Sequence, residues 1–266
     1  MANPTIPGVV LHPIEVDLLC TFAEVQAPFP IEVGVPATSD VERGVLYQAA
    51  SQELMERGLA DENGPLDVAE EFVYLLRSGT GVLDLVLNKD SGTTRVAVLT
   101  SADEALLVSQ DTTDQHRMVR MWAATLDDAI GCLAHLIPPA EMPLTAPFSV
   151  PLRPLEEAFQ VMLARHPAPM SAAEVEDLVR SHGIDDRAVR RMVSHLQPVL
   201  GNGQCGVARR DDSEDQWHRA SEELRWLDTD RGRYRLAVID DGWMSVNPLG
   251  LDELYAELRG LAARIR

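Results

Sequence analysis

The residues with chemical potential in this sequence are seven histidines, three cysteines and one short acidic run. The histidines are scattered, and none has a Cys, Asp or Glu partner at a spacing that would bring metal ligands together. The run from Asp211 to Asp215 lacks the ligand spacing and central glycine of a calcium loop. Gly201-Asn-Gly203 precedes no predicted helix, so it does not form a phosphate-binding loop. We therefore expect no enzyme, no catalytic residues, no cofactor and no metal site.

Charge and cysteine usage narrow the possible partners and the compartment. The chain carries 23 Lys and Arg against 42 Asp and Glu, a formal net charge of −19. This charge disfavours nucleic acid and anionic membranes as partners. Cys20, Cys132 and Cys205 are isolated and odd in number, as in proteins of a reducing compartment. With no signal-peptide pattern and no membrane-spanning apolar stretch, we expect a cytoplasmic protein without stable membrane association.

One segment resembles a DNA-binding motif. Ser171–Leu196 reads as a helix, a turn at 182–184 and a second helix that carries Arg187, Arg190 and Arg191. A hairpin is predicted after it, as in a winged helix. The acidic residues around both helices oppose contact with phosphates. A winged-helix DNA-binding transcriptional regulator is therefore the alternative function.

The stretch from Gly203 to Pro248 is predicted to be an antiparallel meander. Asp230-Arg231-Gly232 and Asp241-Gly242 are turn signals, and the residues between them alternate with period two. With Gly232 ending the first loop, one apolar face is expected to carry Trp226 and Tyr234.

The opposite face of the meander mixes arginines with apolar side chains and is the candidate partner surface. Its predicted members are Arg225, Leu227, Arg233, Arg235 and Ala237, with Val207 and Arg209 on a third strand. A similar set in the first half includes Arg117 and Val119. Such a face is equally consistent with a solvated side of an antiparallel sheet. As a binding surface, it would offer apolar area for burial and guanidinium groups for carbonyl and carboxylate oxygens.

The predicted elements repeat along the chain. Residues 9–137 read as a strand, three helices, four strands (82–88, 93–100, 105–110 and 116–122) and a helix. A proline-rich connector covers 138–154, and residues 155–266 repeat helices, meander and final helix. We predict an α+β fold: a broad antiparallel sheet with helical layers, one integrated domain and a pseudo-two-fold internal repeat of halves 1–137 and 155–266.

Three ordered motifs resemble one known family. They are Gly203-Gln-Cys-Gly-Val-Ala-Arg-Arg210, the Trp226–Tyr234 pattern W-x-D-T-x-x-G-R-Y, and Asp241-Gly-Trp243. In this order and spacing they resemble the C-terminal half of the EspG family, the cytosolic chaperones of actinobacterial type VII (ESX) secretion. The resemblance implies a chaperone that keeps a PE–PPE-like helical substrate soluble by masking its hydrophobic tip. It marks Trp226, Tyr234 and Trp243 as structural motif residues. We expect a monomer or weak homodimer.

Overall fold

The computed structural model describes residues 6–34, 37, 39–153, 171–181, 186–211, 216–220, 222–240 and 242–266. The chain forms two compact units. The first comprises Met1–Pro138, Gln204–Glu223 and Ala256–Arg266, and the second comprises Pro139–Gly203 and Leu224–Tyr255. Two segments of the predicted C-terminal half therefore belong to the same unit as the N-terminal half. The division at 137 and 155 stays a prediction.

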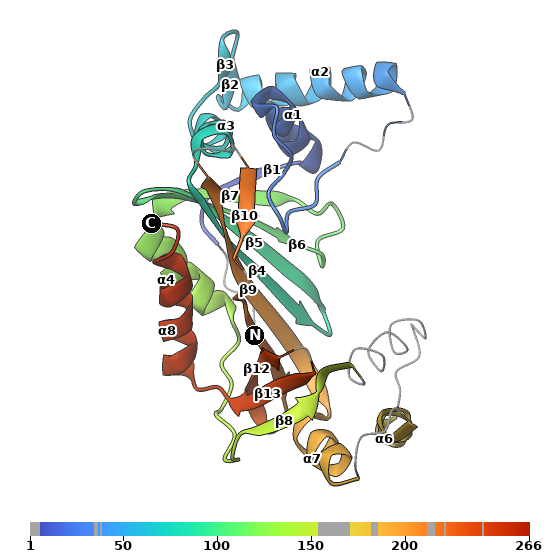
Figure 1. Cartoon of the computed structure of the whole chain (residues 1–266). Coiled ribbons are helices and arrows are strands. Elements are labelled where there is room, and N and C mark those ends of the chain that lie inside the picture. Colours follow the sequence, from blue (N-terminus) through green and yellow to red (C-terminus); the bar gives the residue numbers. More distant parts are fainter. Residues whose placement is uncertain are drawn as a thin grey trace. The chain divides into compact units, whose positions relative to one another are not determined.

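The first unit is built on an antiparallel sheet of strands in the order β1-β7-β6-β5-β4-β9 (Figure 1). The strands are β1 (Val9–Leu11), β4 (Gly81–Lys89), β5 (Gly92–Ser101), β6 (Glu104–Asp111), β7 (Val119–Thr125) and β9 (Val199–Asp211). A short strand, β10 (Gln216–Arg219), pairs with β9. The four strands predicted between 82 and 122 are confirmed, joined by tight turns such as the one that ends at Gly92.

Strand β7 begins three residues later than predicted, because a turn occupies its expected start. The Asp114 carboxylate accepts hydrogen bonds from the backbone N–H groups of His116 and Met118. Arg117 adopts a left-handed backbone, with φ at 49°. The Asp114 side chain thus replaces the ladder partner that a strand would have supplied at this point.

Three of the four helices described in the first unit start at a side-chain cap. The four helices are α1 (Pro13–Ala23), α2 (Asp40–Glu56), α3 (Val68–Ser78) and α4 (Leu126–Leu136), with the small hairpin β2 (Ala60–Asp61) and β3 (Gly64–Pro65). The capped helices are α1, α2 and α4. Ser39 caps α2 by accepting a hydrogen bond from the Glu42 N–H at 3.2 Å, and Thr125 caps α4 in the same way. Phe72 and Leu76 of α3 are buried in one core with Val82 and Leu99 of the sheet. Burial of this face stabilises α1 and α3 on the strands.

The second unit has its own antiparallel strands, in the order β9-β11-β12-β13-β8. They are β8 (Phe148–Pro151), β11 (Leu224–Thr229), β12 (Gly232–Asp240) and β13 (Trp243–Pro248), accompanied by α6 (Ala172–Ser181) and α7 (Asp186–Leu196). Met192 and Leu196 of α7 pack with Phe148, Tyr234 and Val246 in a second core. Helix α8 (Leu251–Ala262) starts in this unit and ends in the first.

The two strand orders have the same connectivity. In each unit the first strand along the chain, β1 or β8, pairs with the last strand, β7 or β13. The predicted α+β fold with a large antiparallel sheet is confirmed, whereas the pseudo-two-fold repeat stays a prediction. No helix within the described ranges is long and apolar enough to span a bilayer.

Candidate partner-binding site

The hairpin of β11 and β12 has a shorter loop than the sequence suggested, and this changes which residues share a face. Thr229 pairs directly with Gly232, so only Asp230 and Arg231 form the loop. The Thr229 hydroxyl closes it by donating to the Gly232 carbonyl at 3.0 Å and accepting from the Arg231 N–H at 3.2 Å. The predicted faces assumed a loop that included Gly232. Since side chains alternate, this difference of one residue moves one strand's side chains to the other face.

The prediction that Arg225 and Leu227 share one face with Arg233, Arg235 and Ala237 is therefore wrong. Trp226 lies opposite Arg235, and Leu227 lies opposite Tyr234. Arg233, Arg235 and Ala237 share the face of Trp226, whereas Arg225 and Leu227 share the face of Tyr234. Trp226 and Tyr234, predicted to share one apolar face, are buried on opposite faces.

Helix α7 covers the face that carries Tyr234. The Tyr234 hydroxyl lies 3.2 Å from Nδ1 of His195, and the His195 ring packs against Phe148 with 5.7 Å between centroids. Tyr234 is fully buried there. Burial, together with the cations Arg231 and Arg191, lowers the pKa of His195. Tyr234 thus packs in the core of the second unit, beneath α7.

On the other face of this hairpin, Trp226 and Arg233 are buried, and Arg235 and Ala237 are half-buried. Arg235 is half-buried and lies opposite Asn247, and Ala237 lies opposite Ser245. Arg233 on the same face is buried and binds Asp228 through Nε at 2.6 Å and Nη2 at 3.0 Å. Its guanidinium also lies 5.6 Å from the centre of the Trp226 ring. Arg233 is thus held inside the unit, while Arg235 and Ala237 remain at the surface.

Close packing also explains the first glycine of the motif. A Cβ atom on Gly203 would lie 1.9 Å from Cζ2 of Trp226, so any larger side chain would displace the indole. The motif residues Gly203 and Trp226 are therefore complementary parts of one contact. Trp243, by contrast, is 48% exposed, close in sequence to the exposed Val238 and Ile239 at the β12–β13 turn.

The remaining candidate residues are not gathered at one surface. Val207 and Val119 are buried, while Arg209 is exposed. Arg117 is exposed in the turn before β7 and forms an ion pair with Glu32 at 3.3 Å. The two valines are core residues of the first unit. A role in partner binding stays a proposal for the exposed and half-buried members of the set.

The segment considered for DNA binding does not have a winged-helix arrangement. Helix α7 packs into the core of the second unit, where Arg191 lies 5.7 Å from the centre of the Phe148 ring. The strand that follows, β9, is a member of the large sheet and not of a separate wing. The turn at 182–184 and the side chain of Arg187 lie outside the described residues. This alternative is not supported.

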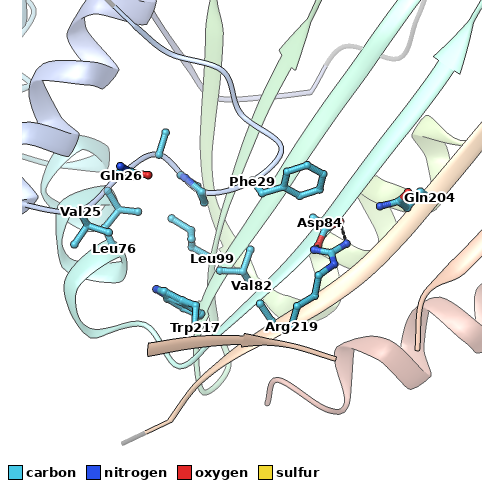
Figure 2. A pocket seen from close by; sticks show the side chains of 13 residues that line it. Val25, Gln26, Phe29, Leu76, Val82, Asp84, Leu99, Gln204, Trp217 and Arg219 are labelled. Atoms are coloured by element: carbon cyan, nitrogen blue, oxygen red, sulfur yellow. Dashed lines mark hydrogen bonds and ion pairs between the residues drawn. The ribbon is translucent and has the colours of Figure 1, made fainter. Parts of the chain in front are cut away.

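Sequence reasoning missed a pocket of about 470 Å³ in the first unit (Figure 2). Strand β10 and the loop after α1 form its walls, with Trp217 and Arg219 on one side and Phe29 on the other. Arg219 binds the buried Asp84 of β4 through two hydrogen bonds of 2.6 and 2.9 Å. The only signal in the sequence was Asp84, a carboxylate in the middle of an otherwise apolar strand.

Metal ligands are not gathered in the described part of the chain: no three His, Cys, Asp or Glu side chains form a group there that could hold an ion. A binding function must then be judged from surfaces and from relatives. A model of the EspG family matches residues 12–260. The chain belongs to the EspG family. The resemblance carried by the three motifs is thereby confirmed.

One solved structure with a similar fold is the Mycobacterium tuberculosis type VII secretion system chaperone EspG5 in complex with the PE25–PPE41 dimer. It aligns with 97% of this EspG-family chain and 96% of its own, with a TM-score of 0.62 and 11% sequence identity. At this identity the comparison establishes the shared fold. Comparison with curated protein sequences gave no match.

Proposed function

We propose that this EspG-family protein is a cytoplasmic secretion chaperone that binds a PE–PPE-like substrate of a type VII secretion system. The observation that carries the proposal is family membership across nearly the whole chain, joined to a fold shared with EspG5. That relative was solved in complex with a PE–PPE dimer. Binding would mask the exposed apolar tip of the helical substrate and so prevent its self-association. This is a binding function and needs no catalytic step.

The part of the β11–β12 hairpin that carries the half-buried Arg235 and Ala237 is the proposed contact surface. Arg235 and Ala237 combine a guanidinium donor with small apolar area, a composition suited to helix ends, whose last carbonyl oxygens lack partners. Arg225, which is exposed, and Leu227 lie on the opposite face, against which α7 packs, so they do not belong to the same surface as Arg235. Arg209, exposed on β9, and Arg117, exposed before β7, are outlying candidates.

The experiment is affinity purification of the tagged protein from a lysate of its source organism, at low and at high salt, followed by mass spectrometry. We expect a helical PE–PPE-like pair that stays bound at moderate salt, because apolar burial is not screened by ions. Recovery of nucleic acid that is lost at high salt would contradict the proposal. Recovery of no protein above an untagged control, with the chain folded, would also contradict it.

A further inference from the structure

The pocket of the first unit has an apolar floor and two aromatic walls. Val82 of β4, Leu99 of β5 and Ala208 of β9 supply the floor. Val82 and Leu99 are direct partners across their strands, so they present one continuous surface. Trp217 and Phe29 stand over it from β10 and from the loop after α1 (Figure 2). Its volume, about 470 Å³, lies within the range of sites that hold small organic molecules.

The charges beside the pocket are already matched to one another. Both oxygens of Asp84, which is 1% exposed, bind the Arg219 guanidinium, and Nε of Arg219 binds Glu223 at 2.6 Å. The face of the same guanidinium lies 5.2 Å from the Phe29 ring centre. Two carboxylates thus surround the Arg219 cation, and a second cation, Arg210, lies 5.5 Å from the centre of the Trp217 ring. A charged ligand of either sign would have to compete with these existing interactions.

Close packing keeps this arrangement in place. A Cβ atom on Gly206 would lie 2.5 Å from Nη2 of Arg219, so the glycine gives the guanidinium room to reach Asp84. The register of β10 sets Arg219 beside Ala208 and Trp217 beside Arg210. The polar groups left to meet a ligand are the neutral side-chain amides of Gln26 and Gln204, which also line the pocket.

From this geometry we infer that the pocket binds an uncharged, largely apolar small molecule carrying one or two hydrogen-bonding groups. The floor and the two aromatic rings bury the apolar part, while the glutamine amides orient the polar group. None of the residues that line the pocket belongs to β11 or β12, and the inference does not depend on the proposed chaperone function. It can therefore be tested whether or not a substrate is known.

The test is a fluorescence titration of the purified protein with Nile red, an uncharged apolar dye. We expect saturable binding with a shift of emission to shorter wavelength. Ala208→Phe fills the floor from β9, and Ala27→Phe fills the pocket from the loop, so each should weaken binding about tenfold or more. The matched control is Ala123→Phe, at an exposed position of β7 away from the pocket, which should bind as the unmodified protein does. Thermal melting checks that each variant is folded.

A dye of different charge gives a second test of the pocket. The anionic dye 1-anilinonaphthalene-8-sulfonate should bind more weakly than Nile red, and Glu223→Gln should strengthen its binding by removing one carboxylate. Equal Nile red binding by the folded Ala208→Phe and Ala27→Phe variants would overturn the assignment, as would tighter binding of the anionic dye to the unmodified protein. Displacement of Nile red by a helical partner protein would place a protein segment in the pocket and would also overturn it.

Discussion

Asp84 and Arg219 form a two-hydrogen-bond ion pair that joins the buried strand β4 to the short strand β10. Removal of one partner leaves the other charge buried without compensation, which costs far more than the intact pair contributes. We expect Arg219→Leu to lower the free energy of unfolding by about 3 kcal/mol, the lower end for buried pairs, because Arg219 is partly exposed. The measurement is urea denaturation at pH 7. The double variant Asp84→Leu/Arg219→Leu should recover most of the loss, and a double variant as unstable as the single would contradict this account.

The cost of Arg219→Leu should depend on pH. Burial raises the pKa of Asp84, and Arg219 opposes that rise. Without Arg219 the pKa rises further, so the folded state holds the Asp84 proton to a higher pH than the unfolded chain does. Stability then falls as the pH rises from the ordinary range of a carboxyl group to the raised folded pKa. The difference in the free energy of unfolding between the variant and the unmodified protein should be large at pH 7 and smaller near pH 4. A difference that does not change with pH would indicate lost packing alone.

Gly232 should tolerate no side chain. Its φ is 118°, and a Cβ atom would lie 2.2 Å from the Glu141 carbonyl oxygen. We expect Gly232→Ala to destabilise the protein by about 2 kcal/mol or more, measured by chemical denaturation. Gly260→Ala is the matched control, because a Cβ atom there meets nothing within 4 Å on helix α8. It should be neutral or stabilise by up to about 1 kcal/mol. Equal effects of the two substitutions would refute the strain assigned to Gly232.

The sequence predicted the elements better than the contacts between them. The alternation that predicted strands 82–88 and 93–100 is a local signal, and the structure has β4 and β5 at these positions with a tight turn between them. The faces of β11 and β12 depended on whether Gly232 belongs to the loop or to the strand. That choice is made by the Thr229 hydroxyl, a side chain whose turn-forming role sequence reasoning overlooked.

The pocket was beyond local reasoning for a different reason. Asp84 and Arg219 are 135 positions apart in the sequence. The pattern of residues along β4 does not indicate that Asp84 has a partner on β10. Only the folded chain brings Phe29 and Trp217 to the same site. Long-range pairs of this kind leave no periodic pattern that could be read in advance.

The corrected register gives a sharp test of the substrate surface. Arg235 lies on the face of the β11–β12 hairpin that carries Trp226, and the exposed Arg225 lies on the face that carries Tyr234, against which α7 packs. We expect Arg235→Glu to weaken capture of a PE–PPE-like substrate about tenfold, because it reverses a charge at the proposed contact. Arg225→Glu makes the same charge change on the same hairpin and should leave capture nearly unchanged. Co-purification from cells that express both partners measures the effect, and loss of capture by Arg225→Glu alone would place the surface on the other face.

Acid should destabilise the second unit through His195. Its pKa is lowered in the folded protein by burial and by nearby Arg231 and Arg191. As the pH falls below about 6.5, the unfolded chain takes up a proton that folded His195 resists, so stability decreases. We expect His195→Phe to reduce the loss of stability between pH 7.5 and 5.5, measured by denaturation at both values. The comparison is His116→Gln, at an exposed position, which should preserve the full loss. An unchanged loss in His195→Phe would exclude this histidine as the cause.

The chain passes between its two units four times, at 138/139, 203/204, 223/224 and 255/256. The first unit is therefore synthesised as three separate segments of the chain. The last segment includes Ile265, whose carbonyl accepts a hydrogen bond from the Thr100 hydroxyl. Neither unit can be excised by one cut, so a nascent chain halted at residue 138 would lack both β9 and the end of α8. The first unit can therefore complete its fold only after the C-terminal residues have been synthesised. By that point the whole of the second unit has been synthesised as well.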